Sequence, residues 1–116
     1  MAIKRIEPGV RFSSAVVHGN TVYLAGITAE NPVPSTKKQT EQILKKIDRI
    51  LKAAGSHKSK VLTANCWVTD IRNWAEMNEA WDAWIDKNNM PVRATVEAKL
   101  ANPKLLVEIM VTAAID

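Results

Sequence analysis

Arg93 is a side chain whose chemistry suits either a small acid or a carboxylate of the protein itself. It lies in the segment PVRATVE, residues 91–97. Its planar guanidinium can meet a carboxylate with two parallel, charge-assisted hydrogen bonds. Glu97 and Glu108 are alternative partners, and an ion pair between Arg93 and one of them across a subunit boundary is the simpler interpretation of these residues taken alone. Ligand binding and subunit pairing are therefore both open.

The histidines and the cysteine do not form a catalytic or metal-binding pattern. His18, His57 and Cys66 lack the short spacings of metal ligands. The sequence has neither a glycine-rich phosphate loop nor a Ser-x-x-Lys arrangement. Cys66 falls on the helix-facing side of its expected strand, which favours a small core residue over a nucleophile. We therefore expect no metal ion and no cofactor.

Length and composition indicate one globular domain, residues 1–116. The chain is 47% hydrophobic and 24% charged, which is enough for a single core. One cysteine excludes an intrachain disulfide and is typical of a reducing compartment. The first residues lack the apolar stretch of a signal peptide, and no apolar run approaches the roughly 18 residues that span a bilayer. We expect a cytoplasmic protein with no membrane partner.

The net charge of +4 leaves nucleic acid to be considered as a partner. Lys45, Arg49 and Lys52 have helical spacing and would share one helix face. Nucleic-acid modules usually interleave such charges with stacking aromatic residues or add a recognition helix. Neither occurs here, so we interpret the basic residues as a solvated helix face and expect no nucleic-acid partner.

Elements that could position these residues begin with a hairpin. The β-rich runs 12–18 and 21–27 flank Gly19-Asn20, a pair that accepts the backbone of a tight turn. Residues 3–6 predict a short first strand. A long helix is predicted over 36–54, with a capping box from Thr36 and Gln39 and with Gly55 as its stop. Its apolar stripe consists of Ile43, Leu44, Ile47, Ile50, Leu51 and Ala54.

The second half alternates strand, helix, strand and strand. Residues 61–69 predict a strand, and a helix capped by Asn73 follows and ends before Asn88. Strands at 93–100 and 105–115 complete an α+β fold with two helices on one sheet face. The buried stripe of the second helix is predicted to be Trp74, Met77, Trp81, Trp84 and Ile85.

Period-two alternation assigns a face to each strand residue. The helix-facing set is predicted to be Leu62, Ala64, Cys66, Val68, Ala94, Val96, Ala98, Val107, Ile109 and Val111. The open face is predicted to carry Tyr23, Ile27, Trp67, Arg93, Thr95, Glu97, Glu108, Met110 and Thr112. This mixture is too apolar for simple solvation, so it favours burial against other subunits with a polar site at the seam.

Several segments together resemble the RidA (YjgF-like) family of reactive-intermediate deaminases. They are VYLAG (22–26), LKAAG (51–55), WVTD (67–70), PVRATVE (91–97) and VEI (107–109), in the family's order. The resemblance implies a chorismate-mutase-like α+β fold with one mixed sheet. It also implies a homotrimer with a barrel-like centre and ligand clefts at the subunit interfaces.

The resemblance implies hydrolysis of 2-imino acids, released as enamines by other enzymes, to 2-keto acids and ammonia. Arg93 matches the family's catalytic, carboxylate-binding arginine, and Asn78 matches an asparagine near the cleft. The other positions matched to the substrate-binding site are Phe12, Ala25, Ile27, Thr95 and Met110.

Four of these positions depart from the family pattern. Phe12 replaces a tyrosine, Ala25 a serine and Thr95 a cysteine, and Met110 falls where we align the family's water-activating glutamate. Met110 cannot move a proton, which weakens or alters the expected activity. Glu108 lies one two-residue step away and is either a replacement acid or an ion-pair partner between subunits. The alternative function is a non-catalytic binder of small carboxylates, and RNA binding or cleavage is a third reading.

Overall fold

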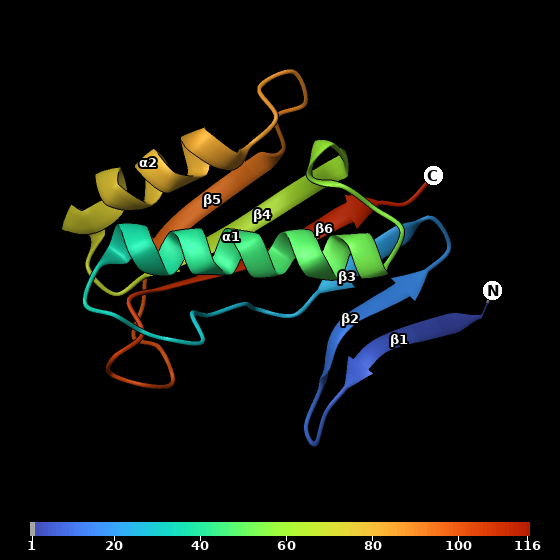
Figure 1. Cartoon of the computed structure of the whole chain (residues 1–116), viewed down its shortest axis with the longest axis horizontal. Coiled ribbons are helices and arrows are strands. Elements are labelled where there is room, and N and C mark those ends of the chain that lie inside the picture. Colours follow the sequence, from blue (N-terminus) through green and yellow to red (C-terminus); the bar gives the residue numbers. More distant parts are fainter. Residues whose placement is uncertain (1) are drawn as a thin grey trace.

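Six strands form one mixed sheet, and two helices cover one of its faces (Figure 1). The computed structural model describes residues 2–116. The strands are β1 Ile3–Pro8, β2 Ser13–His18, β3 Thr21–Leu24, β4 Val61–Val68, β5 Val92–Glu97 and β6 Val107–Ala114. The helices are α1 Thr36–Ala53 and α2 Trp74–Trp84, with short 3₁₀ turns at Lys58–Lys60 and Ile71–Asn73. The prediction of an α+β fold with two helices on a mixed sheet is confirmed.

The strand order is β1-β2-β3-β6-β4-β5. Only β4 and β5 run parallel; the other neighbours are antiparallel. The α2 segment makes the crossover that a parallel pair requires. β5 is therefore an edge strand beneath α2, and β1 is the opposite edge.

Helix α1 forms over the predicted residues, but its cap is one residue earlier than expected. Ser35 Oγ accepts from the Lys38 amide at 3.1 Å, so Ser35 and not Thr36 is the N-cap. The Thr36 side chain is buried, which removes it from capping. Five residues of the predicted apolar stripe are at most 2% exposed: Ile43, Leu44, Ile47, Ile50 and Leu51. They pack on the sheet and make the centre of the core.

Gln39 was predicted to close the capping box but instead joins three chain segments. Its side chain is fully buried. Nε2 donates to the carbonyls of Val33 (2.8 Å) and Lys104 (3.0 Å), and Oε1 accepts from the Leu106 amide at 2.9 Å. These bonds fix the loop before α1 and the loop before β6 to the helix. A buried backbone N–H or C=O group that loses its water needs another hydrogen-bond partner, and Gln39 supplies one to each of these groups.

Two predictions about α2 were wrong. Asn73 makes no side-chain capping bond, and Asp70 instead accepts from the Arg72 amide one turn earlier. Trp74 is 49% exposed, whereas Met77, Ala80 and Trp81 are buried. Its ring remains uncovered because it lies over edge strand β5, beyond which the sheet has no further strand.

Two strand faces also differ from the prediction. A register shift between Val61 and Thr63 inserts one residue into β4, so Leu62 is 48% exposed. On β5 the faces are exchanged. Thr95 pairs in parallel with buried Cys66, and Arg93 pairs with buried Ala64, so both turn toward the helices.

Val96, predicted to face the helices, is instead 51% exposed, and Ala94 is exposed as well. Alternation shows which residues of a strand share a face, but the register with the neighbouring strand decides which face that is.

Replacing Gln39 with Leu should destabilise the fold by about 2–4 kcal/mol, since it leaves three backbone groups unpaired in the interior. Urea unfolding at one protein concentration measures the change. Gln42→Leu is the matched control, because Gln42 also bonds a loop backbone, that of Asn31, but in exposed surroundings where water can replace it. An equal decrease in the free energy of unfolding in Gln39→Leu and Gln42→Leu would contradict the role given to Gln39.

Candidate functional site

Arg93 is held by α2 and keeps most of its donors free. Its Nη2 donates to Asn78 Oδ1 at 2.7 Å. Its Cζ lies 5.1 Å from the centre of the Trp81 ring, a cation–π contact. A guanidinium has five N–H donors, and within residues 2–116 only the bond to Asn78 engages one. The side chain is therefore fixed in orientation while still able to bind an anion.

Thr95 and two apolar side chains surround this guanidinium. Arg93, Thr95, Ile71 and Trp74 line one open depression beside edge strand β5. Thr95 Oγ1 is buried without a hydrogen-bond partner among the described residues. Such a group costs free energy unless a ligand or water pairs with it. We call these four residues, with Asn78, the arginine pocket.

Trp74 and Ile71 were not predicted at this site. The apolar spacing assigned Trp74 to the core, and nothing in the sequence separates a core tryptophan from one that projects over an edge strand. Cys66, beside Thr95 in the register, is buried. Burial raises the pKa of its thiol to about 11, so it stays protonated at neutral pH, as expected of a core residue.

A second group of predicted site residues lies beside β2, β3 and β6, in a region that we call the Glu108 cavity. It is an open cavity of about 650 Å³. Phe12 comes from the loop between β1 and β2, Ala25 and Gly26 follow β3, and Glu108 lies on β6. The remaining lining residues are Ser13, Val16, Tyr23, Leu24, Thr28, Ala101 and Leu105.

Glu108 is the one carboxyl group among the described residues that line this cavity. Burial raises its pKa above the ordinary value of 4.5, because low polarity disfavours the charged carboxylate. Gly26 leaves room for it, since a Cβ at that position would collide with Glu108 Oε2. A partly buried carboxyl with a raised pKa is suited to exchange protons with a ligand.

Three candidate residues lie outside both regions. Met110, predicted to replace the catalytic glutamate, faces the open side opposite Asn65 and does not line the Glu108 cavity. Ile27 was expected on the open face but is 4% exposed, and its backbone pairs with Ile109. Glu97 accepts from the Ile71 amide at 3.0 Å.

The arginine pocket and the Glu108 cavity face opposite sides of the sheet. Arg93 points toward α2, whereas Glu108 lies opposite Trp67 on the open face. Two strand spacings, about 9–10 Å, also separate β5 from β6. One ligand of a few carbon atoms cannot contact both groups within a single chain.

Other site types receive no support from residues 2–116. No group of three or more His, Cys, Asp or Glu side chains could hold a metal ion there. In the same range, no helix has the length and hydropathy needed to cross a membrane. Of the basic residues predicted to share one face of α1, Arg49 forms an ion pair, with Glu7, and Lys46 and Lys37 of the same helix pair with Glu30 and Glu79.

The chain is similar to known proteins over nearly its whole length. The family model described as Endoribonuclease L-PSP matches residues 2–115. The RutC family protein YoaB of Escherichia coli K12 is 44% identical over 115 residues, covering 99% of this chain and 100% of that protein. A RutC family protein of Haemophilus influenzae is 43% identical over 114 residues, covering 97% and 98%.

Solved structures agree with this relationship. NMB1025 of Neisseria meningitidis, a member of the YjgF protein family, has a TM-score of 0.97 and 40% identity, covering 100% of this chain and 97% of that one. Rv2704 of Mycobacterium tuberculosis, from the YjgF/YER057c/UK114 family, has a TM-score of 0.89 and 31% identity, covering 98% and 100%. This chain therefore belongs to the YjgF/RidA family, to which the Endoribonuclease L-PSP model corresponds.

Proposed function

We propose that this protein hydrolyses 2-imino acids to 2-keto acids and ammonia. The observation that carries the proposal is the arginine pocket, where a guanidinium fixed by Asn78 and Trp81 retains free donors beside the unpaired Thr95 hydroxyl. A planar, charged fork next to a neutral donor suits a carboxylate with a polar atom on the adjacent carbon. Family membership supports the same ligand class.

The complete site is proposed to form between two copies of the chain, in a homotrimer with a barrel-like centre. The arginine pocket of one copy would face the Glu108 cavity of its neighbour, because neither copy can bring its own two groups together. The open sheet face supports this assembly, since half-exposed Tyr23, Leu62 and Val96 lie on it.

In the proposed reaction Arg93 binds the carboxylate and Thr95 donates to the substrate. Glu108 accepts a proton from water as the water oxygen bonds to the imine carbon, and it returns a proton to the nitrogen. In the resulting carbinolamine Glu108 takes the hydroxyl proton and passes it to the amino nitrogen, so that the carbon–nitrogen bond breaks as the carbonyl forms and ammonia leaves. One imino acid and one water thus give one keto acid and one ammonia, without an oxidant or reductant. In this reaction Glu108, and not the residue at position 110, supplies the acid–base group.

Replacing Arg93 with Ala should lower kcat/KM for freshly generated 2-imino acids by about 10²–10³-fold, because two charge-assisted bonds to the carboxylate are lost. Arg93→Lys should recover only part of the loss, since an ammonium lacks the planar fork. A spectroscopic hydrolysis assay measures both variants. Arg72→Ala is the control, because Arg72 is an exposed arginine paired only with Asp70. Unchanged turnover in Arg93→Ala would end the proposal.

Replacing Glu108 with Gln should lower kcat by about 10²–10⁴-fold, the usual contribution of a general acid/base. The wild-type rate should fall on the acidic side with a midpoint above 4.5, because the base is lost as pH drops through its raised pKa. The pH–rate profile of Glu108→Gln should lack this decrease at acidic pH, which we call the acidic limb.

Glu108→Gln should be no less stable than wild type at neutral pH, where the ionised carboxylate carries the cost of burial. Thermal unfolding measures this, and Glu76→Gln, on the exposed side of α2, is the control for both readouts. An acidic limb that persists in Glu108→Gln would contradict its role. Binding of a 2-keto acid without turnover in wild type would instead favour the non-catalytic carboxylate binder.

A further inference from the structure

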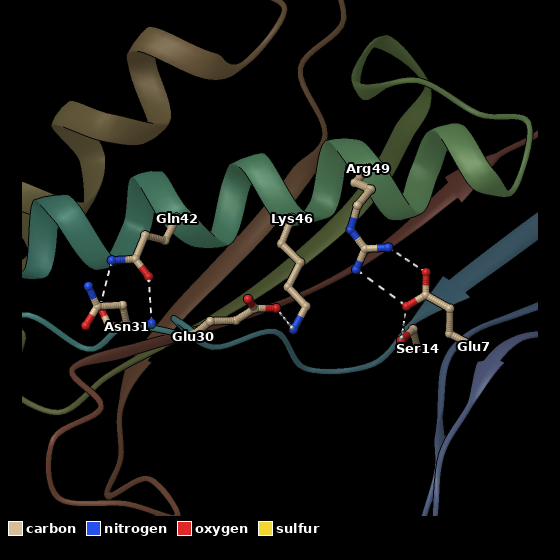
Figure 2. Close-up of polar contacts among 7 residues, drawn as sticks. All are labelled: Glu7, Ser14, Glu30, Asn31, Gln42, Lys46 and Arg49. Carbon is tan, nitrogen blue, oxygen red and sulfur yellow. Dashed lines mark hydrogen bonds and ion pairs between the residues drawn. The ribbon is translucent and has the colours of Figure 1, made fainter.

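One polar row of α1 contacts two of the segments that form or adjoin the Glu108 cavity. Gln42, Lys46 and Arg49 lie on one face of the helix, and all three reach toward segments of the N-terminal part of the chain (Figure 2). Gln42 makes two bonds to the Asn31 backbone, of 3.0 and 2.7 Å, and Lys46 lies 3.1 Å from Glu30. These contacts secure the segment that continues from the Ala25–Thr28 wall.

Arg49 secures the other wall through Glu7. Its Nη1 donates to Glu7 Oε2 at 2.5 Å and its Nη2 to Oε1 at 3.4 Å. Ser14 Oγ donates to Glu7 Oε1 at 3.1 Å, as Figure 2 shows. These bonds hold the pKa of the Glu7 carboxyl below its ordinary value, with Arg49 as the largest cause. One carboxylate thereby joins α1 to both strands of the first hairpin.

The backbone of Glu7 has an unusual conformation that depends on the contacts of its side chain. Glu7 has φ +50°, a left-handed conformation that residues other than glycine seldom adopt. Such a conformation persists only where the surrounding contacts determine it. Glu7 precedes the loop 9–12, whose ends are joined by a bond of 2.8 Å from the Gly9 amide to the Phe12 carbonyl.

Phe12 depends on this loop for its place in the cavity. Its side chain is 70% exposed, so packing within the chain does little to fix it. Its place in the cavity lining follows from the direction in which the loop leaves β1 and enters β2. The bonds of Glu7 to Arg49 and Ser14 control that direction from both sides.

We propose that Arg49 is a positioning residue that acts through Glu7 to set the Phe12 wall of the substrate cavity; this rests on the hydrolysis proposed above. An exposed ion pair contributes little to global stability. Its effect here is local, because the pair joins the two ends of a short loop to a rigid helix. Loss of the pair loosens the wall that contacts substrate and leaves Arg93 and Glu108 untouched.

The test compares Arg49→Met, Glu7→Gln and the double variant with wild type. Amide hydrogen exchange at Gly9 should accelerate about threefold or more in each, because the loop opens more often. KM for an imino acid should rise about three- to tenfold with kcat within about twofold, the pattern of lost substrate binding. The double variant should add nothing beyond the larger single effect, since both changes break the Arg49–Glu7 pair.

Arg49→Lys should restore part of both readouts. Lys37→Met is the matched control, because Lys37 forms an exposed ion pair of 3.0 Å from the same helix, but to Glu79 on α2. The inference is overturned if Arg49→Met behaves like Lys37→Met, or if exchange accelerates while KM stays unchanged. If wild type neither turns over imino acids nor binds a 2-keto acid, the proposed function fails, and the exchange result alone decides whether Arg49 orders the Phe12 loop.

Discussion

The parallel pairing of β4 with β5 places Arg93 beside Ala64 and turns its guanidinium toward α2. Asn78 and Trp81 then hold it from one side. Because β5 is the edge of the sheet, the remaining donors are not covered by another strand. The crossover through α2 thus provides both the support for the charge and its access to a ligand. An antiparallel β5 would not require the crossover helix that holds Arg93.

The same orientation separates the two chemical groups of the site. Glu108 lies on the open face of β6, where burial raises its pKa, and Arg93 lies on the helix side of β5. In the proposed hydrolysis Arg93 binds the carboxylate and Glu108 transfers the protons, and the two side chains of a single chain are too far apart to contact the same small ligand. The proposed hydrolysis therefore requires assembly, since only contacts between copies could bring an Arg93 and a Glu108 together.

Local patterns in the sequence predicted the elements well. The apolar spacing of α1 and the Gly19-Asn20 turn depend on neighbouring residues, which a single sequence displays fully. Non-local features were missed. The face of β5 depends on its register with β4, and the exposure of Trp74 depends on the sheet ending at β5. Burial of Gln39 depends on two loops that are far apart in the chain.

The residues of the candidate site divide in the same way. Arg93 could be singled out from its segment only through the family resemblance, because an arginine two residues before a threonine is equally suited to an ion pair with Glu97 or Glu108. The sequence alone did not show whether position 108 or position 110 carries the acid–base group of the cavity. Glu108 and Met110 share a strand face, and only the bend of the chain after β3, which brings Ala25 and Gly26 against Glu108, distinguishes them.

The most direct test of a site shared between copies is complementation of two inactive variants. Arg93→Ala and Glu108→Gln would be unfolded together, refolded as mixed assemblies and assayed for imino acid hydrolysis. Random mixing should restore about one quarter of wild-type activity, since that share of interfaces receives an intact arginine from one copy and an intact glutamate from its neighbour. Mixed assemblies that remain as inactive as each variant alone would contradict the account.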